Sequence, residues 1–283
     1  MSIVGIGFVQ GRENTNLFFM NKILPVILLL LVTSGFMMND ALRRVEQDSF
    51  STGEVLKYKV HYGMINAAEA VIDIAPEIQK VNNRACYKAN VYGRTVGSFD
   101  FFLRIRDTWR SYIDTTAILP HRFHRNIEEG KYRKKENVSF DHFRNIATVE
   151  DKKGTDTFKI PENVQDIVSG FYYMRTLNLD KYKNGDIIRL QGFFDDEVYD
   201  FTVVFRGREI IETKAGHIRA FKLVPKMPDN KLFSGENAIS FYLSDDKNKI
   251  PVMIKAEMFV GAIKIDLYQY SGLKYRLNLA KGS

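Results

Sequence analysis

The 283-residue sequence contains one cysteine, Cys86, and this scarcity excludes two kinds of site. A lone cysteine cannot close an internal disulfide, and it cannot supply a metal site built from several thiolates. We expect Cys86 to be a small, half-buried strand residue rather than a reactive thiol, because free cysteines are among the most buried residue types.

The sequence also lacks the residue patterns of common catalytic and metal sites. It has no G-x-S-x-G motif, and on a strand His121 and His124 would point to opposite faces, so they could not share a metal ion. The adjacent acids of 195–197 and 245–246 are typical of solvated turns rather than of a catalytic carboxylate pair. We therefore predict no catalytic residue, no metal ligand and no cofactor, and an envelope hydrolase is the least favoured alternative.

Long apolar runs are scarce as well, and the one present is Lys22–Val32, K-I-L-P-V-I-L-L-L-L-V. This run is shorter than the roughly 20 apolar residues that cross a bilayer as a helix. Its leading lysine and the small residues behind it are typical of a secretory signal peptide. We interpret residues 20–38 as that signal peptide and residues 1–19 as an upstream extension from a mis-assigned start.

This interpretation predicts a periplasmic protein whose mature chain begins between Phe36 and Leu42. No cysteine follows the apolar run, so we expect no lipid anchor; no second long apolar run follows either, so we expect no transmembrane span in the mature protein. The formal net charge of +7 changes little when residues 1–35 are removed, and it is too small and too diffuse to indicate nucleic-acid binding. The oligomeric state is left open.

Apolar residues (45%) and aromatic residues (13%) are plentiful, and from Gly53 onward they alternate with polar ones. In residues 55–62, Leu56, Tyr58, Val60 and Tyr62 share one face of a strand, and lysines and a histidine share the other. Further runs of this kind occupy 69–75, 86–92, 98–106, 108–114, 121–128, 136–141, 143–150, 186–194, 197–206, 208–213, 216–224, 237–243, 250–259 and 261–270.

Short connectors with turn chemistry separate these runs. They are Val81–Arg84, Glu129–Gly130, Asp195–Asp196, Arg206–Gly207 and Asp245–Asn248. Many strands joined by hairpin-length loops indicate an antiparallel sheet. We predict a mainly β fold, a curved antiparallel sheet or incomplete β-barrel, formed by residues 50–275 as a single domain.

One amphipathic helix is predicted over residues 164–178, near the middle of the domain. Its apolar residues recur at helical spacing and are expected to face the core: Val164, Ile167, Val168, Phe171, Met174 and Leu177. The helix would join two halves, 50–160 and 185–275, that resemble each other in one respect. Asp114 to Pro120 and Asp245 to Pro251 are both aspartate turns that open a strand with proline, so the halves are either structural repeats or similar by coincidence.

Several segments together resemble a known family, the domain of unknown function 3108. They are G-E (53–54) with L-K-Y-K-V-H-Y-G (56–63), D-T-T-A-I-L-P-H-R-F (114–123), D-I-V-S-G-F-Y-Y-M-R (166–175) and S-D-D-K-N-K-I-P-V-M-I (244–254), with Gly261 closing a hairpin. The resemblance covers residues 50 to 275 and implies an exported bacterial protein of a family with many members in Bacteroidetes. It implies no catalytic residue. More loosely, the aspartate–proline hairpin is similar to lipoprotein-carrier folds, in which an incomplete β-barrel curls around a helix and holds an acyl chain.

A curved sheet with so many aromatic residues either fills its interior with the helix or leaves an apolar cavity. The candidates for lining such a cavity are Tyr58, Val60, Tyr62, Phe99, Phe101, Leu103, Trp109, Phe201, Phe205 and Phe241. A cavity predicts that the protein binds a lipid, a lipoprotein or another envelope component; a filled interior predicts a structural or assembly accessory of the outer membrane that acts through its surface.

The densest basic stretch, G-K-Y-R-K-K-E (130–136), is a second candidate for contact with a partner. Its residues Lys131, Arg133, Lys134 and Lys135 are either a contact for phosphate or lipopolysaccharide, or the charged edge of an ordinary hairpin.

Overall fold

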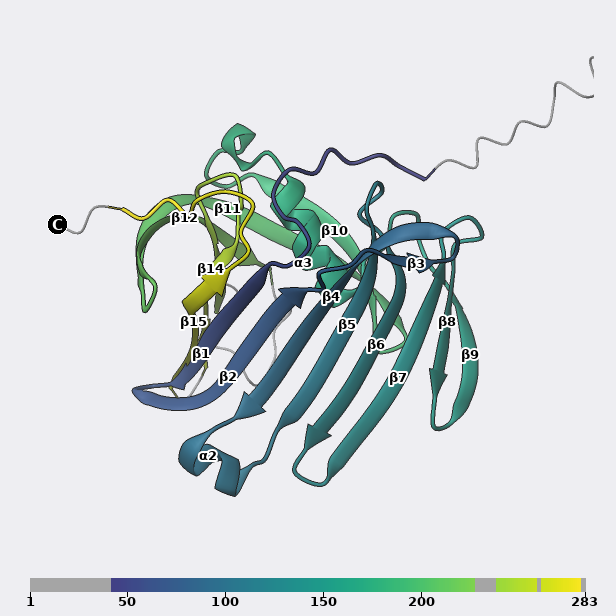
Figure 1. The fold of residues 1–283 in the computed structure, drawn as a ribbon, viewed down its shortest axis with the longest axis horizontal. Coiled ribbons are helices and arrows are strands. Elements are labelled where there is room, and N and C mark those ends of the chain that lie inside the picture. Colours follow the sequence, from purple (N-terminus) through teal and green to yellow (C-terminus); the bar gives the residue numbers. More distant parts are fainter. Residues whose placement is uncertain (1–41, 227–237, 259–260, 281–283) are drawn as a thin grey trace, which may run out of the picture. The chain divides into compact units, whose positions relative to one another are not determined.

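The computed structural model describes residues 42–226, 238–258 and 261–280. The predicted signal peptide, its cleavage site and the upstream extension lie outside these residues. The described chain is mainly β: fifteen strands form one antiparallel sheet, whose order runs β10-β11-β12-β13-β14-β15-β1-β2-β4-β5-β6-β7-β8-β9, with β3 paired to β4 (Figure 1). The end strands of this order, β10 and β9, do not pair with each other, so the sheet is not closed.

The elements have the following bounds. They are β1 (Val55–Tyr62), β2 (Ile65–Ile74), β3 (Gln79–Val81), β4 (Arg84–Thr95), α2 (Gly97–Phe102), β5 (Arg106–Asp114), β6 (Pro120–Glu129), β7 (Tyr132–Asp141), β8 (Ile146–Asp151), β9 (Gly154–Lys159), α3 (Ile167–Thr176), the 3-10 turn η1 (Leu179–Lys181), β10 (Ile187–Phe194), β11 (Glu197–Thr213), β12 (Gly216–Pro225), β13 (Ile239–Ser244), β14 (Pro251–Glu257) and β15 (Ala262–Ser271).

Most of the predicted strands are confirmed, and the local turn chemistry explains the hairpins between them. The central residues of two hairpins, Asn82-Asn83 and Asp195-Asp196, all adopt positive φ angles between 49° and 66°. Two central residues with positive φ give the type I′ turn, whose twist matches that of the flanking strands, and Asn and Asp tolerate this conformation well. The short strands β3 and β9 were not predicted.

The predicted strand 98–106 is wrong, because residues 97–102 form the helix α2. Pairing between β4 and β5 ends at Arg94 opposite Arg106, so the intervening residues form the connection between the two strands. Asp100 fixes this connection by accepting hydrogen bonds from Thr95 Oγ1 at 2.7 Å and from the guanidinium of Arg106 at 2.7 and 3.0 Å. The alternating aromatic residues here therefore lie on a helical turn, outside the sheet.

The predicted turn at Arg206–Gly207 is also wrong, since β11 continues through it as one strand of 17 residues. The register with β12 shifts between Phe205 and Arg208, and Gly207 adopts a φ of 86°. An extra residue with positive φ inside a strand is a β-bulge, which bends the strand without ending it. The bulge lets β11 change direction where the sheet curves.

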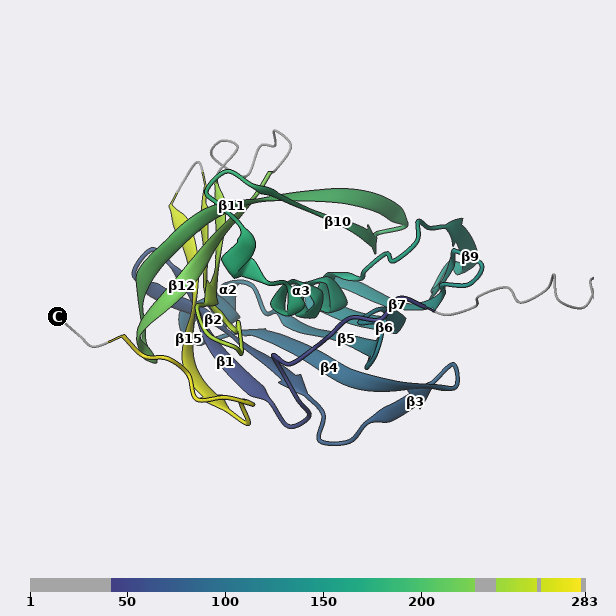
Figure 2. The same ribbon diagram turned by 90° about the horizontal axis from the view of Figure 1, so that it is seen from above.

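The sheet curves around α3, which lies inside it (Figure 2). One apolar cluster joins Val168 and Tyr172 of the helix to Phe50, which precedes β1, and to residues of the first strands such as Ile113. A second cluster lies under β10 to β13 and includes Leu179, Phe205 and Leu243, with Phe171 and Leu177 packed against it. A third cluster connects β1, β11, β12 and β14 through residues such as Leu56, Ile218 and Val252.

The two aspartate–proline connections share their local geometry. Asp114 Oδ1 accepts hydrogen bonds from the amides of Thr116 and Ala117, both at 2.8 Å, in the β5–β6 connection. In the β13–β14 connection, Asp246 Oδ1 likewise accepts from the amides two and three residues later. In each, the residue two before the proline has a positive φ, 49° at Ile118 and 45° at Lys249, and a register shift precedes the connection. The repeat of the whole halves stays a prediction.

Candidate functional site

The helix α3 begins at a well-formed cap. The Asp166 carboxylate accepts hydrogen bonds from the amides of Val168 (2.8 Å) and Ser169 (2.7 Å), and Ser169 Oγ accepts from the amide of Asp166 at 2.9 Å. This reciprocal arrangement is a capping box, which satisfies amides that have no partner inside the helix. The helix starts at Ile167, later than predicted, because Gln165 instead pairs with β10: its amide donates to Gln191 O and its carbonyl accepts from Phe193 N, both at 2.8 Å.

The buried face of α3 differs from the predicted apolar stripe. Val168, Ser169, Tyr172 and Arg175 are buried, whereas Ile167 is 46% exposed. The face that points into the sheet therefore carries polar groups at both ends of the helix, Asp166 with Ser169 at the start and Arg175 at the finish. These buried polar residues make the two ends of α3 the candidate functional site.

The cap carboxylate of Asp166 is itself buried against the sheet. Ser111 of β5 donates a hydrogen bond from Oγ to Asp166 Oδ2 at 2.6 Å. Burial raises the pKa of Asp166 to about 6, and the hydrogen bonds from Ser111, Ser169 and Val168 act in the opposite direction. A carboxyl group with this pKa can exchange a proton near neutral pH, but Asp166 is 2% exposed and therefore out of reach of a substrate.

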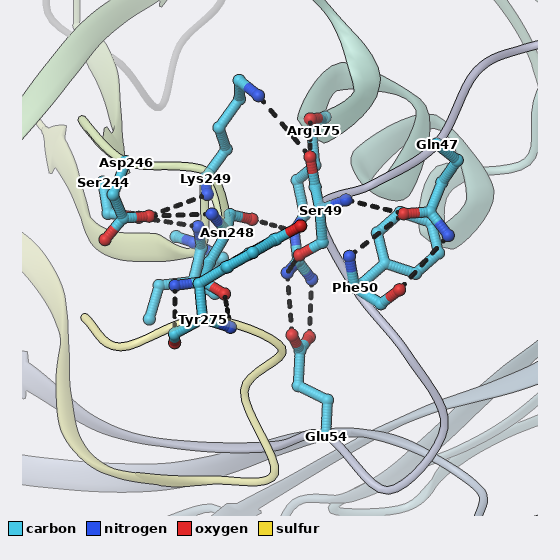
Figure 3. A network of polar contacts seen from close by, with 12 residues as sticks. Gln47, Ser49, Phe50, Glu54, Arg175, Ser244, Asp246, Asn248, Lys249 and Tyr275 are labelled. Carbon is cyan, nitrogen blue, oxygen red and sulfur yellow. Dashed lines mark hydrogen bonds and ion pairs between the residues drawn. The ribbon is translucent and has the colours of Figure 1, made fainter.

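At the other end of α3, Arg175 forms a buried ion pair with Glu54, the residue before β1 (Figure 3). Nη1 donates to Oε1 at 2.6 Å and Nη2 to Oε2 at 2.8 Å, and both side chains are 1% exposed. The guanidinium donates two further hydrogen bonds, from Nε to Asn248 O at 3.0 Å and from Nη2 to Ser49 O at 3.1 Å. Every charge in this pair is compensated, as a buried ion pair requires.

The same network connects four segments that are distant in sequence (Figure 3). Ser49 Oγ donates to the carbonyl of Arg175 at 2.8 Å, and Asn248, in the β13–β14 connection, exchanges hydrogen bonds with the backbone of Tyr275 at 2.9 and 3.0 Å. The segment before β1, the end of α3, the β13–β14 connection and the segment after β15 are thus held together. This arrangement fixes α3 inside the sheet, with the ion pair of Arg175 and Glu54 buried at its centre.

Two surface depressions are large enough for a small ligand, and both are lined mostly by polar residues. The first, of about 610 Å³, lies over β11 to β14 and includes Glu209, Lys222 and Lys255. The second, of about 510 Å³, lies between α3 and strands β10 and β11 and includes Arg43, Arg189 and Phe201. Among the predicted cavity-lining residues, Phe201 alone lines one of these two depressions.

The structure distributes the predicted lining residues over separate places. Tyr58 is in the core, where its hydroxyl donates to Pro251 O at 2.9 Å, and Phe205 is in the cluster under β10 to β13. Phe241 is half-buried against that same cluster, and Trp109 packs at the edge of the first cluster. Val60, Tyr62 and Phe99 are half-buried. The exposed members are Phe101 (87%), Leu103 (48%) and Phe201 (43%).

The predicted basic patch is divided between two faces. Lys131, Arg133 and Lys135 are exposed around the β6–β7 hairpin, but Lys134 points to the concave face, because neighbouring strand residues alternate. There its Nζ pairs with Glu136 Oε2 at 3.1 Å and with Asp195 Oδ1 at 2.7 Å. Arg125, which is 2% exposed, pairs with the same two carboxylates, so Lys134 belongs to a network that holds the β10–β11 hairpin against β6 and β7.

The sequence analysis did not identify the polar residues around α3 as partners. The spacing D-x-x-S in 166–169 is a local signal for a capping box and could have revealed Asp166. No local signal connects Arg175 with Glu54, which lies 121 positions away. Within the described ranges there is no group of three or more His, Cys, Asp or Glu side chains that could hold a metal ion. No helix in the described part of the chain is both long and apolar enough to cross a membrane.

Comparisons with solved structures place the fold beside a β-barrel-like protein. The chain is similar to a beta-barrel-like protein of the domain of unknown function DUF1849 from Brucella abortus, with a TM-score of 0.51 and 13% identity over 78% of this chain and 97% of that one. Two weaker similarities are to a protein of Bacteroides fragilis described as exported, with a YmcC-like fold (TM-score 0.35, 9% identity, 81% and 100% covered), and to one of Parabacteroides distasonis described as a lipoprotein (TM-score 0.27, 10% identity, 81% and 99% covered).

The sequence matches none of the curated proteins with which it was compared. It does match one family, described as protein of unknown function (DUF3108), over residues 57–268. That range contains most of β1, both aspartate–proline connections and α3. The chain belongs to this family.

Proposed function

We propose that this protein is an exported, non-catalytic component of the cell envelope that binds a partner through its surface. The observation that carries the proposal is the fixing of α3 at both ends inside the curved sheet. Asp166 and Ser111 hold the beginning of the helix, and Arg175 and Glu54 hold its end. A helix held in this way is a permanent part of the core, which leaves the outer surfaces for recognition.

The chemistry of the polar residues supports a role without catalysis. Asp166 and Glu54 are buried, and their hydrogen bonds go to groups that stabilise the fold. A general acid or base has to reach a substrate directly or through one water molecule. The two depressions combine opposite charges with few apolar residues, which suits solvent or a polar partner better than an acyl chain.

Mass spectrometry of lipid extracted from the purified exported protein tests this proposal. We expect no acyl lipid in a molar amount comparable to the protein, because the helix occupies the space that an acyl chain would need. A lipid retained at one molecule per protein would overturn the proposal and favour an internal carrier. N-terminal sequencing of the same sample tests export, with a first residue expected between Phe36 and Leu42.

The alternative function, an internal lipid carrier, is favoured by one observation. The sheet is open between β10 and β9, and beside β10 the half-exposed ring of Phe201 lies at the depression next to α3. In a carrier, α3 would act as a lid at this opening. Such a movement would break the pairing of Gln165 with β10. The lipid extraction described above separates the two functions, because only an internal carrier should retain a lipid.

A further inference from the structure

Large exposed apolar side chains gather at one end of the sheet. They belong to the β1–β2 turn, to α2 with the residue after it, and to the β6–β7 turn, which lie along the lower edge in Figure 1. Six side chains form this group, which we call the apolar rim: Met64 (100% exposed), Ile65 (54%), Phe101 (87%), Phe102 (82%), Leu103 (48%) and Tyr132 (55%).

The three parts of the rim are connected by contacts close to their tips. The rings of Tyr62 and Phe99 are 6.4 Å apart, which brings α2 beside the end of β1. Gly130, in the β6–β7 turn, donates a backbone hydrogen bond to Arg104 O at 2.9 Å. A Cβ atom at Gly130 would be 3.4 Å from Leu103 Cδ1. The three parts of the rim are therefore adjacent in the fold.

The rim is held in place by polar contacts behind it. Asp100 binds the guanidinium of Arg106 and Thr95 Oγ1, and Thr95 Oγ1 in turn accepts the amide of Ile105 at 2.9 Å. Phe101 and Phe102 then project from a fixed turn, with ring centroids 5.5 Å apart. A soluble protein rarely exposes several large apolar side chains together, so such a group marks a contact surface.

Basic residues border the part of the rim at α2 and the β6–β7 turn. Arg104, Lys131 and Arg133 are exposed there, together with the acids Glu129 and Glu128, whose side chain is 44% exposed. Arg133 approaches Glu128 only to 4.0 Å, while the nearby acid Asp100 is already paired with Arg106. Aromatic and aliphatic side chains with a basic border are the composition that attaches proteins to an anionic bilayer surface.

We propose that the apolar rim docks this protein on the surface of an anionic phospholipid bilayer. Phe101 and Phe102 enter the interface between headgroups and acyl chains, and Arg104, Lys131 and Arg133 contact the phosphates. A bilayer suits the rim better than a peptide does, because none of its six residues lines either depression. This inference rests on the proposed function, since it names the partner of the surface.

Co-sedimentation with vesicles tests the inference. The purified exported protein should sediment with vesicles of phosphatidylethanolamine and phosphatidylglycerol at 3:1, and at least tenfold less with phosphatidylcholine vesicles. The double variant Phe101→Ser/Phe102→Ser should lose at least tenfold in vesicle affinity without losing stability, because both rings are exposed. Phe143→Ser, at a 53% exposed position of the β7–β8 connection, is the matched control and should bind normally.

A second pair of variants tests the role of charge. Lys131→Glu/Arg133→Glu should reduce binding to the anionic vesicles, as should 0.5 M NaCl, whereas Lys80→Glu, at the exposed position of β3 away from the rim, should not. Equal binding of the wild type and the Phe101/Phe102 variant, or no vesicle binding by the wild type, would overturn the inference. A wild type that forms dimers in analytical ultracentrifugation, while the Phe101/Phe102 variant is monomeric, would assign the rim to self-association and would also overturn it.

The two proposals fail in different ways. If the protein retains no internal lipid and binds no vesicles, surface binding stands and the bilayer is excluded as its partner. If it retains lipid in both the wild type and the Phe101/Phe102 variant, the proposed function fails whatever the vesicle result.

Discussion

The guanidinium of Arg175 donates two hydrogen bonds to the carboxylate of Glu54 across 121 positions of sequence. Each side chain is 1% exposed, so the pair is sealed from water on every side. Glu54 lies at the entrance to β1 and Arg175 in the last turn of α3. The pair therefore decides where the helix ends relative to the sheet.

Removal of one partner of this pair should strongly destabilise the folded protein. We expect Arg175→Met to lower the free energy of unfolding by about 3–5 kcal/mol, because Glu54 would remain buried and charged without a partner. The double variant Arg175→Met/Glu54→Leu should lose clearly less free energy of unfolding than the single variants Arg175→Met and Glu54→Leu lose together. Urea denaturation monitored by circular dichroism measures all four free energies. A loss under about 1 kcal/mol for Arg175→Met would contradict the role of the pair.

His142 should make the protein less stable in acid. Its Nε2 lies 2.7 Å from Pro120 O and its ring stacks on Phe140. Burial lowers the pKa of His142 to about 4 from the ordinary value of 6.5. The unfolded chain therefore binds more protons than the folded protein between pH 6.5 and 4, and stability falls as the pH falls through this window.

The contribution of His142 amounts to at most about 3 kcal/mol at pH 4. In the His142→Gln variant the slope of stability against pH should be smaller between pH 6.5 and 4. Thermal denaturation of both proteins at half-unit pH steps measures this difference. Parallel curves for the two proteins would show that the histidine is protonated in the folded state as easily as in the unfolded one.

Asp166 should have the opposite pH dependence. Its pKa in the folded protein, raised by burial to about 6, exceeds the ordinary value of 3.8. The folded protein therefore binds the extra proton between pH 4 and 6, and the contribution of Asp166 to stability falls as the pH rises through this window. Relative to Asp166→Asn, which keeps a capping side chain, the wild type should lose stability from pH 4 to 6.

The capping role of Asp166 is tested by a second substitution. Asp166→Ala should lower the free energy of unfolding by about 0.5–2 kcal/mol more than Asp166→Asn does, because alanine cannot accept hydrogen bonds from the amides of Val168 and Ser169. Urea denaturation at pH 7 compares the two variants. Equal stability of the alanine and asparagine variants would mean that the amides find other partners.

Cys86 should be unreactive in the folded protein. Its side chain is buried, and burial, with the nearby Asp114 carboxylate as a smaller cause, raises the pKa of the thiol to about 12. The thiolate is the reactive species, so labelling with iodoacetamide at pH 8 should be slow until the protein unfolds. Mass spectrometry in the presence and absence of 6 M guanidinium chloride follows the labelling. Rapid modification of the native protein would contradict a purely structural thiol.

Gly272 should not tolerate a side chain. It has a φ of 66°, and a Cβ atom there would lie 2.0 Å from the carbonyl oxygen of Gly53. Gly272→Ala should therefore lower the free energy of unfolding by more than about 2 kcal/mol, since both the backbone conformation and the close approach oppose it. Gly93→Ala is the control, because its nearest contact would be an ordinary 4.0 Å to Asp107 Cβ. Similar stability of the two variants would argue against the packing of Gly272 on Gly53.

Local patterns in the sequence were enough to predict most of the sheet. Alternation in Val55–Tyr62 predicted β1 with its bounds, and the asparagine and aspartate pairs predicted two hairpins. These features depend on neighbours within a few residues, because side-chain direction alternates along a strand and the turn residues tolerate positive φ on their own. The same reasoning failed for 98–106, where the alternating aromatic residues have no neighbouring strand to pair with.

By itself, the sequence determined a mainly β fold, its family and the presence of one central helix. Only the tertiary structure decided which groups that helix buries, that Lys134 turns inward to Asp195, and that Phe101 and Phe102 stay in water. The physical reason is that burial and ion pairing depend on which surface is covered by residues far away in the chain. Arg175 meets Glu54 only because the sheet curves around α3, and no pattern around either residue contains that curvature.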